Sequence, residues 1–182
     1  EKEGMGVMKA LEERLQQCGL QLHPLITKLG SCRDSIRKMK YPTVTFDFLG
    51  YTFMPREEQN SIRKETFTNW LPAVSKKAMK SMNEKMQEWS VLQQTGNTIQ
   101  EIALKINPVL RGWINYYGKF YKTKLRDFMH IVNVKLAHWA RRKYKNLRTS
   151  DMKAIRWLHR MCVRRPALFA HWSQLGSKPT AG

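Results

Sequence analysis

Beyond residue 70 the apolar residues recur every three or four positions, which is typical of amphipathic helices. A first helix is predicted over "LPAVSKKAMKSMNEKMQEWSVL", and "QQTGN" ends it. Its apolar stripe is formed by Val74, Ala78, Met82 and Met86, with Met79 and Trp89 beside them. Thr98 is placed to cap a second helix with Glu101 at the capping-box position. The apolar stripe of the second helix is Ile99, Ile102, Ala103 and Ile106.

Two further helices are predicted toward the end of the chain. Asn107 followed by Pro108 is typical of an N-cap and a first helical residue, so a new helix or a kink is expected there. A long helix follows over about residues 124–145, and the last begins after a Thr149/Ser150 cap and ends before Pro166. The long helix buries Leu125, Phe128, Met129, Val132, Leu136, Trp139 and Ala140, and Ile131 and Val134 off this stripe indicate burial on two sides. The last helix turns Met152, Ile155, Leu158 and Cys162 inward.

The first 56 residues have a different pattern. Residues 5–17 predict one amphipathic helix that Gly19 ends, and "LQLHP" (20–24) and "TKLGSC" (27–32) alternate like short strands. In "TVTFDFLGYTF" (43–53), Val44, Phe46 and Phe48 are expected to share one strand face. Pro55 and "REEQNSIRK" are then expected to close the β region. The predicted fold class is therefore mainly α, of the α+β kind, with a β region too small to be stable alone. Because the chain opens without an initiator Met, we expect a fragment of a longer product.

Charge adds a function class to this picture. The 182 residues carry a formal charge of +19, and residues 98–182 hold 18 Lys and Arg against three Asp and Glu. A soluble domain with this excess repels itself unless a polyanion neutralises it, so nucleic acid is the expected partner. An anionic membrane surface is the main alternative. The sequence shows neither an apolar run of about 20 residues nor a signal peptide.

The cysteines indicate a reducing compartment. Cys18, Cys32 and Cys162 form no CxxC pair, and their odd number and wide spacing favour free thiols. A metal held by Cys18, His23 and Cys32 is disfavoured because this spacing matches no common zinc module.

The basic residues fall mainly into three groups, and the group on the last helix lies opposite the apolar stripe of that helix. A single group is ordinarily a solvated helix face, but three groups in a segment with three acids favour phosphate binding. The groups are Lys153, Arg156, Arg160 and Arg164 on the last helix; Arg111, Asn115, Lys119 and Lys122, if the preceding helix extends that far; and Arg141, Arg142, Lys143 and Lys145.

The aromatic residues of "INPVLRGWINYYGKFYKTK" (106–124) divide between two roles. Trp113 and Tyr117 continue the apolar stripe and are predicted to lie in the core. Tyr116 and Tyr121 fall beside basic residues, and two interpretations stay open for them: a packed ring with a solvated hydroxyl, or a ring that stacks on a ribose or base.

Four motifs together resemble group II intron-encoded proteins, the reverse transcriptase and maturase of mobile introns. The motifs are "FDFLGYTFMPR", "INPVLRGWINYYGKF", "LAHWARRKYK" and "ALFAHW". The resemblance implies that residues 1–56 are the C-terminal remnant of a palm and residues 57–182 a helical thumb or maturase domain. From the basic groups and the tyrosines beside them, RNA contacts are expected at Arg111, Asn115, Tyr116, Lys119, Lys122, Lys124, Arg141, Arg142, Lys145, Lys153, Arg156, Arg160 and Arg164.

The polymerase site of that family is missing from this sequence. There is no Tyr-Ala-Asp-Asp hairpin to hold two Mg²⁺ ions, and the acids of the palm-like strands, Asp34 and Asp47, lie far apart. Where the family tends to read "LHPEKTK", this chain reads "LHPLITK", with Leu25 and Ile26 in place of Glu and Lys. We therefore expect no catalytic residue and no cofactor in this chain, with any Mg²⁺ held by the RNA or by a palm site outside it.

Three functional hypotheses follow. The first is an RNA-binding maturase module that clamps structured intron RNA and assists splicing. The second is the thumb fragment of an active RNA-directed DNA polymerase that grips an RNA/DNA duplex and needs an N-terminal reverse-transcriptase portion. The third is a decayed remnant with an unpaired sheet edge. The expected location is a bacterial cytoplasm or an organelle, and no membrane partner is expected.

Overall fold

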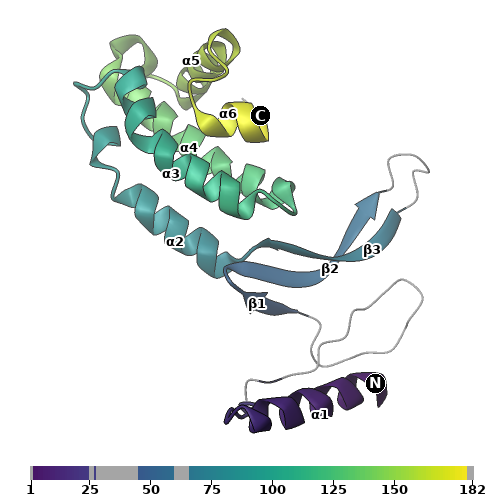
Figure 1. Ribbon diagram of the computed structural model, residues 1–182. Coiled ribbons are helices and arrows are strands. Elements are labelled where there is room, and N and C mark those ends of the chain that lie inside the picture. Colours follow the sequence, from purple (N-terminus) through teal and green to yellow (C-terminus); the bar gives the residue numbers. More distant parts are fainter. Residues whose placement is uncertain (1, 25–26, 28–44, 60–65, 180–182) are drawn as a thin grey trace. The chain divides into compact units, whose positions relative to one another are not determined.

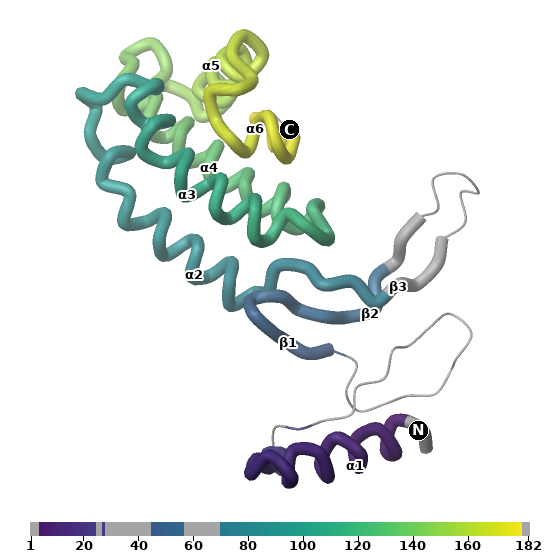
Figure 2. Tube along the Cα trace, viewed as in Figure 1, coloured from purple at the N-terminus to yellow at the C-terminus, as the bar shows by residue number. Residues whose placement is uncertain are grey.

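The computed structural model describes residues 2–24, 27, 45–59 and 66–179, with the backbone alone at 2–3, 57–59 and 66–69 (Figures 1 and 2). The chain is mainly α with one three-stranded antiparallel sheet in the order β1-β2-β3, which confirms the predicted fold class. The elements are α1 (Lys2–Gln17), β1 (Phe46–Phe48), β2 (Tyr51–Gln59), β3 (Thr66–Val74), α2 (Lys76–Gln87), the 3-10 turn η1 (Ser90–Leu92), α3 (Ile99–Tyr117), α4 (Lys122–Lys143), the 3-10 turn η2 (Lys145–Leu147), α5 (Asp151–Arg164) and α6 (Ala170–Leu175).

The chain divides into two compact units. The N-terminal unit comprises Glu1–Phe46 and Phe53–Trp70, and the helical unit comprises Asp47–Thr52 and Leu71–Gly182. In the N-terminal unit, α1 ends before Gly19, whose φ of 71° only glycine adopts readily, as predicted. Phe46 stacks on Phe53 with ring centroids 4.8 Å apart. The assignment of residues 1–56 to a palm and 57–182 to a thumb stays a prediction.

The sheet is longer than the sequence predicted. Pro55 does not end the β region: β2 continues to Gln59, and β3 occupies residues that the helical pattern had claimed, including Val74. The reason is that β1 has only three residues. Beyond β1, one side of β2 pairs with β3 and the other side is a sheet edge, where Pro is tolerated. Residues 20–23 form no strand, and Val44 and most of 27–32 lie outside the described residues, as does Cys32.

The turn between β1 and β2 belongs to the helical unit. Leu49 and Gly50 both have positive φ, 49° and 79°, as the central residues of a type I′ turn require. The Gly50 carbonyl accepts a hydrogen bond from the Ser75 N–H at 2.9 Å. The Ser75 hydroxyl in turn accepts from the Ala78 N–H and caps α2, so one buried serine joins the turn to the start of a helix.

Helix α3 corrects one prediction and confirms another. Thr98 and Glu101 form the predicted capping box. No helix begins at Asn107-Pro108, however, because α3 runs unbroken from Ile99 to Tyr117 with Pro108 inside it. Asn107 is not an N-cap: its side chain donates to the Leu168 carbonyl at 2.9 Å. Asn107 thus forms a tertiary hydrogen bond instead of the expected local cap, and a partner so distant in the chain cannot be read from the sequence.

The core of the helical unit lies around α4, which contacts α3, α5 and α6 (Figure 1). All seven α4 residues predicted to be buried are buried, and α5 buries Leu158 and Cys162 as expected. Ile131 is 36% exposed, so α4 is not enclosed on two sides there, because its neighbours cover only part of its circumference. Met152 is exposed rather than inward, because it lies two residues before buried Ala154 and hence on nearly the opposite side of α5.

Two buried asparagines hold the C-terminal segment against the bundle. Figure 2 traces the path of this segment. Asn107 of α3 binds both sides of the α6 start, since it also accepts from the Ala170 N–H at 3.0 Å. Asn133 of α4 donates to the Ser177 carbonyl at 3.0 Å and accepts from the Trp172 Nε1 at 2.8 Å. Amide side chains can satisfy backbone groups of this kind, which explains why they occupy core positions.

Candidate nucleic-acid interface

The basic face of α5 matches its sequence prediction. Ala154, Leu158 and Cys162 are buried on one side of the helix. The four cations spaced along the opposite side are exposed, and within the described part of the chain none of them forms an ion pair. These residues, which we call the α5 face, are Lys153, Arg156, Arg160 and Arg164. A row of unneutralised cations on a rigid helix can contact successive phosphates of a polyanion.

The second predicted group is not one helical stripe. Helix α3 ends at Tyr117 and Gly118 caps it, so Lys119 lies in the connection and Lys122 begins α4. Position 118 requires glycine, because a Cβ atom there would lie 2.4 Å from the Ile114 carbonyl oxygen. The residues predicted to bind RNA around this connection are all exposed: Arg111, Asn115, Tyr116, Lys119, Lys122 and Lys124.

The aromatic residues next to this connection form a cluster. Tyr51 is buried and its ring lies 5.5–5.6 Å from the rings of Tyr116, Tyr117 and Phe120. Burial, followed by the nearby Tyr116, raises the pKa of both Tyr51 and Tyr117 above the ordinary tyrosine value. Tyr117 is half-buried against the core, as is Trp113, which stacks on Trp89. The core assignment of Trp113 and Tyr117 therefore holds.

Tyr116 combines features of its two open interpretations. Its hydroxyl donates to the Leu49 carbonyl at 2.9 Å, so the polar end is used inside the helical unit. The residue as a whole nevertheless remains 46% exposed. Tyr121 is half-buried, and its N–H lies 3.4 Å from the Pro72 carbonyl oxygen. The ring of Tyr116 is thus held in place and accessible, which a stacking surface requires.

Residues of the third basic group form hydrogen bonds that stabilise the fold, which the sequence did not indicate. Arg142 donates through Nη2 to the Leu92 carbonyl, and Lys143 donates through Nζ to the Asn97 carbonyl and lies 5.6 Å from the Trp139 ring. Trp139 itself donates to the Gln94 carbonyl at 3.1 Å. Together these residues of α4 fix the connection between α2 and α3. Lys145 and Arg142 are the exposed members of the group.

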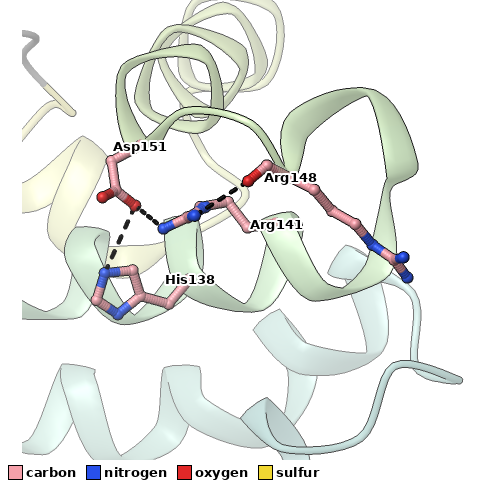
Figure 3. Close-up of polar contacts among 4 residues, drawn as sticks. All are labelled: His138, Arg141, Arg148 and Asp151. Atoms are coloured by element: carbon pink, nitrogen blue, oxygen red, sulfur yellow. Dashed lines mark hydrogen bonds and ion pairs between the residues drawn. The ribbon is translucent and has the colours of Figure 1, made fainter.

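Arg141 fixes the other side of α4. It donates through Nη2 to the Arg148 carbonyl at 3.0 Å and forms an ion pair through Nη1 with Asp151. The same Asp151 oxygen lies 3.8 Å from Nε2 of His138 (Figure 3). The Arg141 Nε is buried without a hydrogen-bond partner among the described residues. One guanidinium thus ties the end of α4 to the start of α5.

Two hollows lie at the ends of α4, and cations line both. One, of about 470 Å³, is lined by His138, Arg141, Arg142 and Arg148, and we call it the α4–α5 hollow. The other, of about 480 Å³, is lined by Arg126, Asp127, His130, Gly176, Ser177 and Lys178. The RNA-contact prediction omitted Arg126, Arg148 and Lys178. In the sequence, only their position in the strongly basic half of the chain could have indicated a contact with RNA.

The comparisons bear on the same residues. Residues 79–157 match the family described as the group II intron, maturase-specific domain, which spans α2 from Met79 to α5 at Trp157. The comparison with curated proteins and the comparison with solved structures gave no match. Among the described helices, none is both long and apolar enough to cross a membrane.

The matched segment contains the α3–α4 connection, the α4–α5 hollow and the first half of the α5 face. It also contains two of the motifs on which the resemblance rested, "INPVLRGWINYYGKF" and "LAHWARRKYK". A role related to group II intron maturases, and so to splicing, follows from this match. This match supports a group II intron maturase C-terminal region, in which the segment similar to the maturase-specific domain lies at residues 79–157.

Proposed function

We propose that this chain binds structured group II intron RNA and thereby favours the folded, splicing-competent form of that RNA. The observation that carries the proposal is the α5 face, where four exposed cations stand without acidic partners among the described residues. Phosphate contacts of this kind supply most of the affinity of proteins for RNA, and they position the protein without reading sequence.

A further observation supports RNA shape recognition over a general attraction to anions. The connection between α3 and α4 presents exposed Lys119 and Lys122 three and six residues after Tyr116, which is itself exposed. A cation beside an accessible aromatic ring suits an unpaired nucleotide, whose phosphate and base are then bound together. The intron RNA itself would perform the splicing chemistry, with Mg²⁺ bound to the RNA, and the protein would hold its active shape.

The test measures affinity for intron RNA over a range of salt concentrations. If six to eight phosphates are neutralised, the slope of log affinity against log salt is expected near about −5. Replacing Arg156, Arg160 and Arg164 by Ala is expected to weaken binding at least roughly tenfold and to make the slope shallower by about 3. The charge-matched control replaces Lys76, Lys77 and Lys80 of α2, which are exposed on another helix, and is expected to change the affinity much less.

The outcomes separate the candidate functions. A slope near zero, or equal affinity for heparin and intron RNA, would rule out specific intron binding. Tighter binding to an RNA/DNA duplex than to intron RNA would instead favour a thumb that grips a template-primer duplex. Equal effects of the two triple variants would show that net charge, and not the α5 face, governs binding.

A further inference from the structure

The α4–α5 hollow carries cations that the fold leaves without acidic partners. Its lining contains three arginines and a histidine, and Asp151 is the carboxylate that forms ion pairs with these residues in the described part of the chain, with Arg141 and, at 3.8 Å, with His138. Figure 3 shows the Arg148 guanidinium pointing away from Asp151. Within the described residues, Arg142 and Arg148 therefore keep their positive charges without a counter-ion, and an anion is the ligand that such a hollow favours.

The hollow is also built rigidly. Arg141 is fixed by the Arg148 carbonyl and by Asp151, and Arg142 is fixed by the Leu92 carbonyl. Side chains that are already held lose little conformational entropy when a ligand arrives. Its volume of about 470 Å³ lies within the range of roughly 300–1,000 Å³ that is usual for small-molecule pockets. Space for a phosphate group with its attached sugar is therefore available.

We infer that the α4–α5 hollow binds one phosphodiester group of the RNA backbone, with Arg148 as its principal ligand and His138 as a second. This inference rests on the proposed function. The hollow adjoins the start of the α5 face: Thr149, which directly follows the lining residue Arg148, accepts a hydrogen bond from Lys153. An RNA strand that lies along the α5 face thus meets a phosphate-binding arginine at the start of that helix. Planar guanidinium groups suit phosphate because they donate two parallel hydrogen bonds.

The negative charge of Asp151 is expected to weaken phosphate binding in the hollow. Its carboxylate pairs with Arg141 and lies 3.8 Å from His138, two residues that line the hollow, so it repels an incoming phosphate while it neutralises Arg141. Asp151→Asn removes this charge and keeps an oxygen that can accept from Arg141. The variant is expected to bind intron RNA two- to fivefold more tightly, whereas a residue with a purely structural role would have no reason to raise affinity when it is replaced.

The experiment combines affinity with phosphate interference mapping, in which single methylphosphonates replace RNA phosphates. Arg148→Ala is expected to weaken binding about tenfold, to make the salt slope shallower by about 1, and to abolish interference at one phosphate position. The matched control is Arg165→Ala, an exposed arginine of equal charge outside the hollow, which is expected to preserve that position. His138→Gln is expected to weaken interference at the same position and no other.

Each result bears on a different claim. If the wild-type chain binds RNA and Arg148→Ala behaves like Arg165→Ala in both affinity and interference, the hollow is not a phosphodiester site and the proposed function stands. If the wild-type chain fails to bind intron RNA, the proposed function fails, and the occupant named here fails with it. If inorganic phosphate shifts the His138 resonances saturably and Arg148→Ala leaves RNA interference unchanged, the hollow binds a free anion and the inference is overturned.

Discussion

The side-chain oxygen of Asn133 lies 2.8 Å from Nε2 of His171 in the core of the helical unit. The same oxygen accepts from Trp172 Nε1, which can only donate, so it is an acceptor and His171 Nε2 carries the proton. His171 is fully buried, and its Nδ1 has no partner among the described residues. This neutral tautomer fixes the C-terminal segment on α4.

The burial of His171 predicts a pH-dependent stability. Desolvation lowers its pKa from about 6.5 to about 3, so the unfolded chain takes up a proton before the folded chain does. The free energy of unfolding is therefore expected to fall as the pH drops from about 6.5 toward 3, by up to about 1.4 kcal/mol per pH unit from this group. Above pH 6.5 neutral His171 makes its full contribution to the free energy of unfolding. Urea denaturation at pH 7.5, 6.0 and 4.5 measures it.

Two variants isolate the contribution of His171. His171→Gln keeps a donor for Asn133 but cannot titrate, so it is expected to be less stable at pH 7.5 and to lose less stability on acidification. His130→Gln, at an exposed histidine of α4, is expected to retain the wild-type pH dependence. A His171→Gln protein with the full wild-type slope would contradict the assignment.

Asn133 is expected to be among the most sensitive polar positions of the fold. Asn133→Ala leaves the Trp172 Nε1, the His171 Nε2 and the Ser177 carbonyl without their partner in a buried place. Since an unsatisfied buried polar group costs about 1–3 kcal/mol, a loss of about 3 kcal/mol in unfolding free energy is expected. The control, Asn115→Ala at an exposed helical asparagine, is expected to stay within about 0.5 kcal/mol. Equal denaturation midpoints for the two variants would refute the prediction.

Neighbouring cations near the end of α4 are expected to separate stability from RNA binding. Arg142→Ala removes the donor of the buried Leu92 carbonyl and is expected to cost about 1–2 kcal/mol of stability. Lys145→Ala, at an exposed lysine three residues later, is expected to leave stability within about 0.5 kcal/mol. It is expected instead to make the salt slope of RNA binding shallower by about 1. Thermal denaturation and filter binding on both variants check the contrast.

Two glycines are expected to respond to alanine in opposite directions. Gly50→Ala places a Cβ atom 2.9 Å from the Tyr117 hydroxyl at a backbone φ of 79°, so a loss of about 2 kcal/mol is expected from strain and displacement. Gly112→Ala, in the exposed middle of α3 with nothing within 4 Å, is expected to add about 0.5–1 kcal/mol. Differential scanning calorimetry measures both. A Gly50→Ala protein at least as stable as the wild type would show that the turn adapts without cost.

Periodicity predicted most of the helical core because the signal is local. The α4 stripe from Leu125 to Ala140 is buried as predicted, since a residue's side of a helix depends only on its position in the helical repeat. The capping box at Thr98 and Glu101 was likewise readable, because both partners lie within one turn. The extension of β2 past Pro55 was not, since the effect of a proline depends on which strands lie beside it.

The candidate interface divides in the same way. The sequence by itself determined the α5 face, because four cations at helical spacing opposite an apolar stripe must be exposed once the helix packs. Only the tertiary structure decided that Arg141, Arg142 and Lys143 hold neighbouring connections, and that Asn107 and Asn133 bind a segment tens of residues away. Each of them donates to a backbone carbonyl, a group that every residue possesses, so no pattern of side chains along the chain could reveal which carbonyl each one meets.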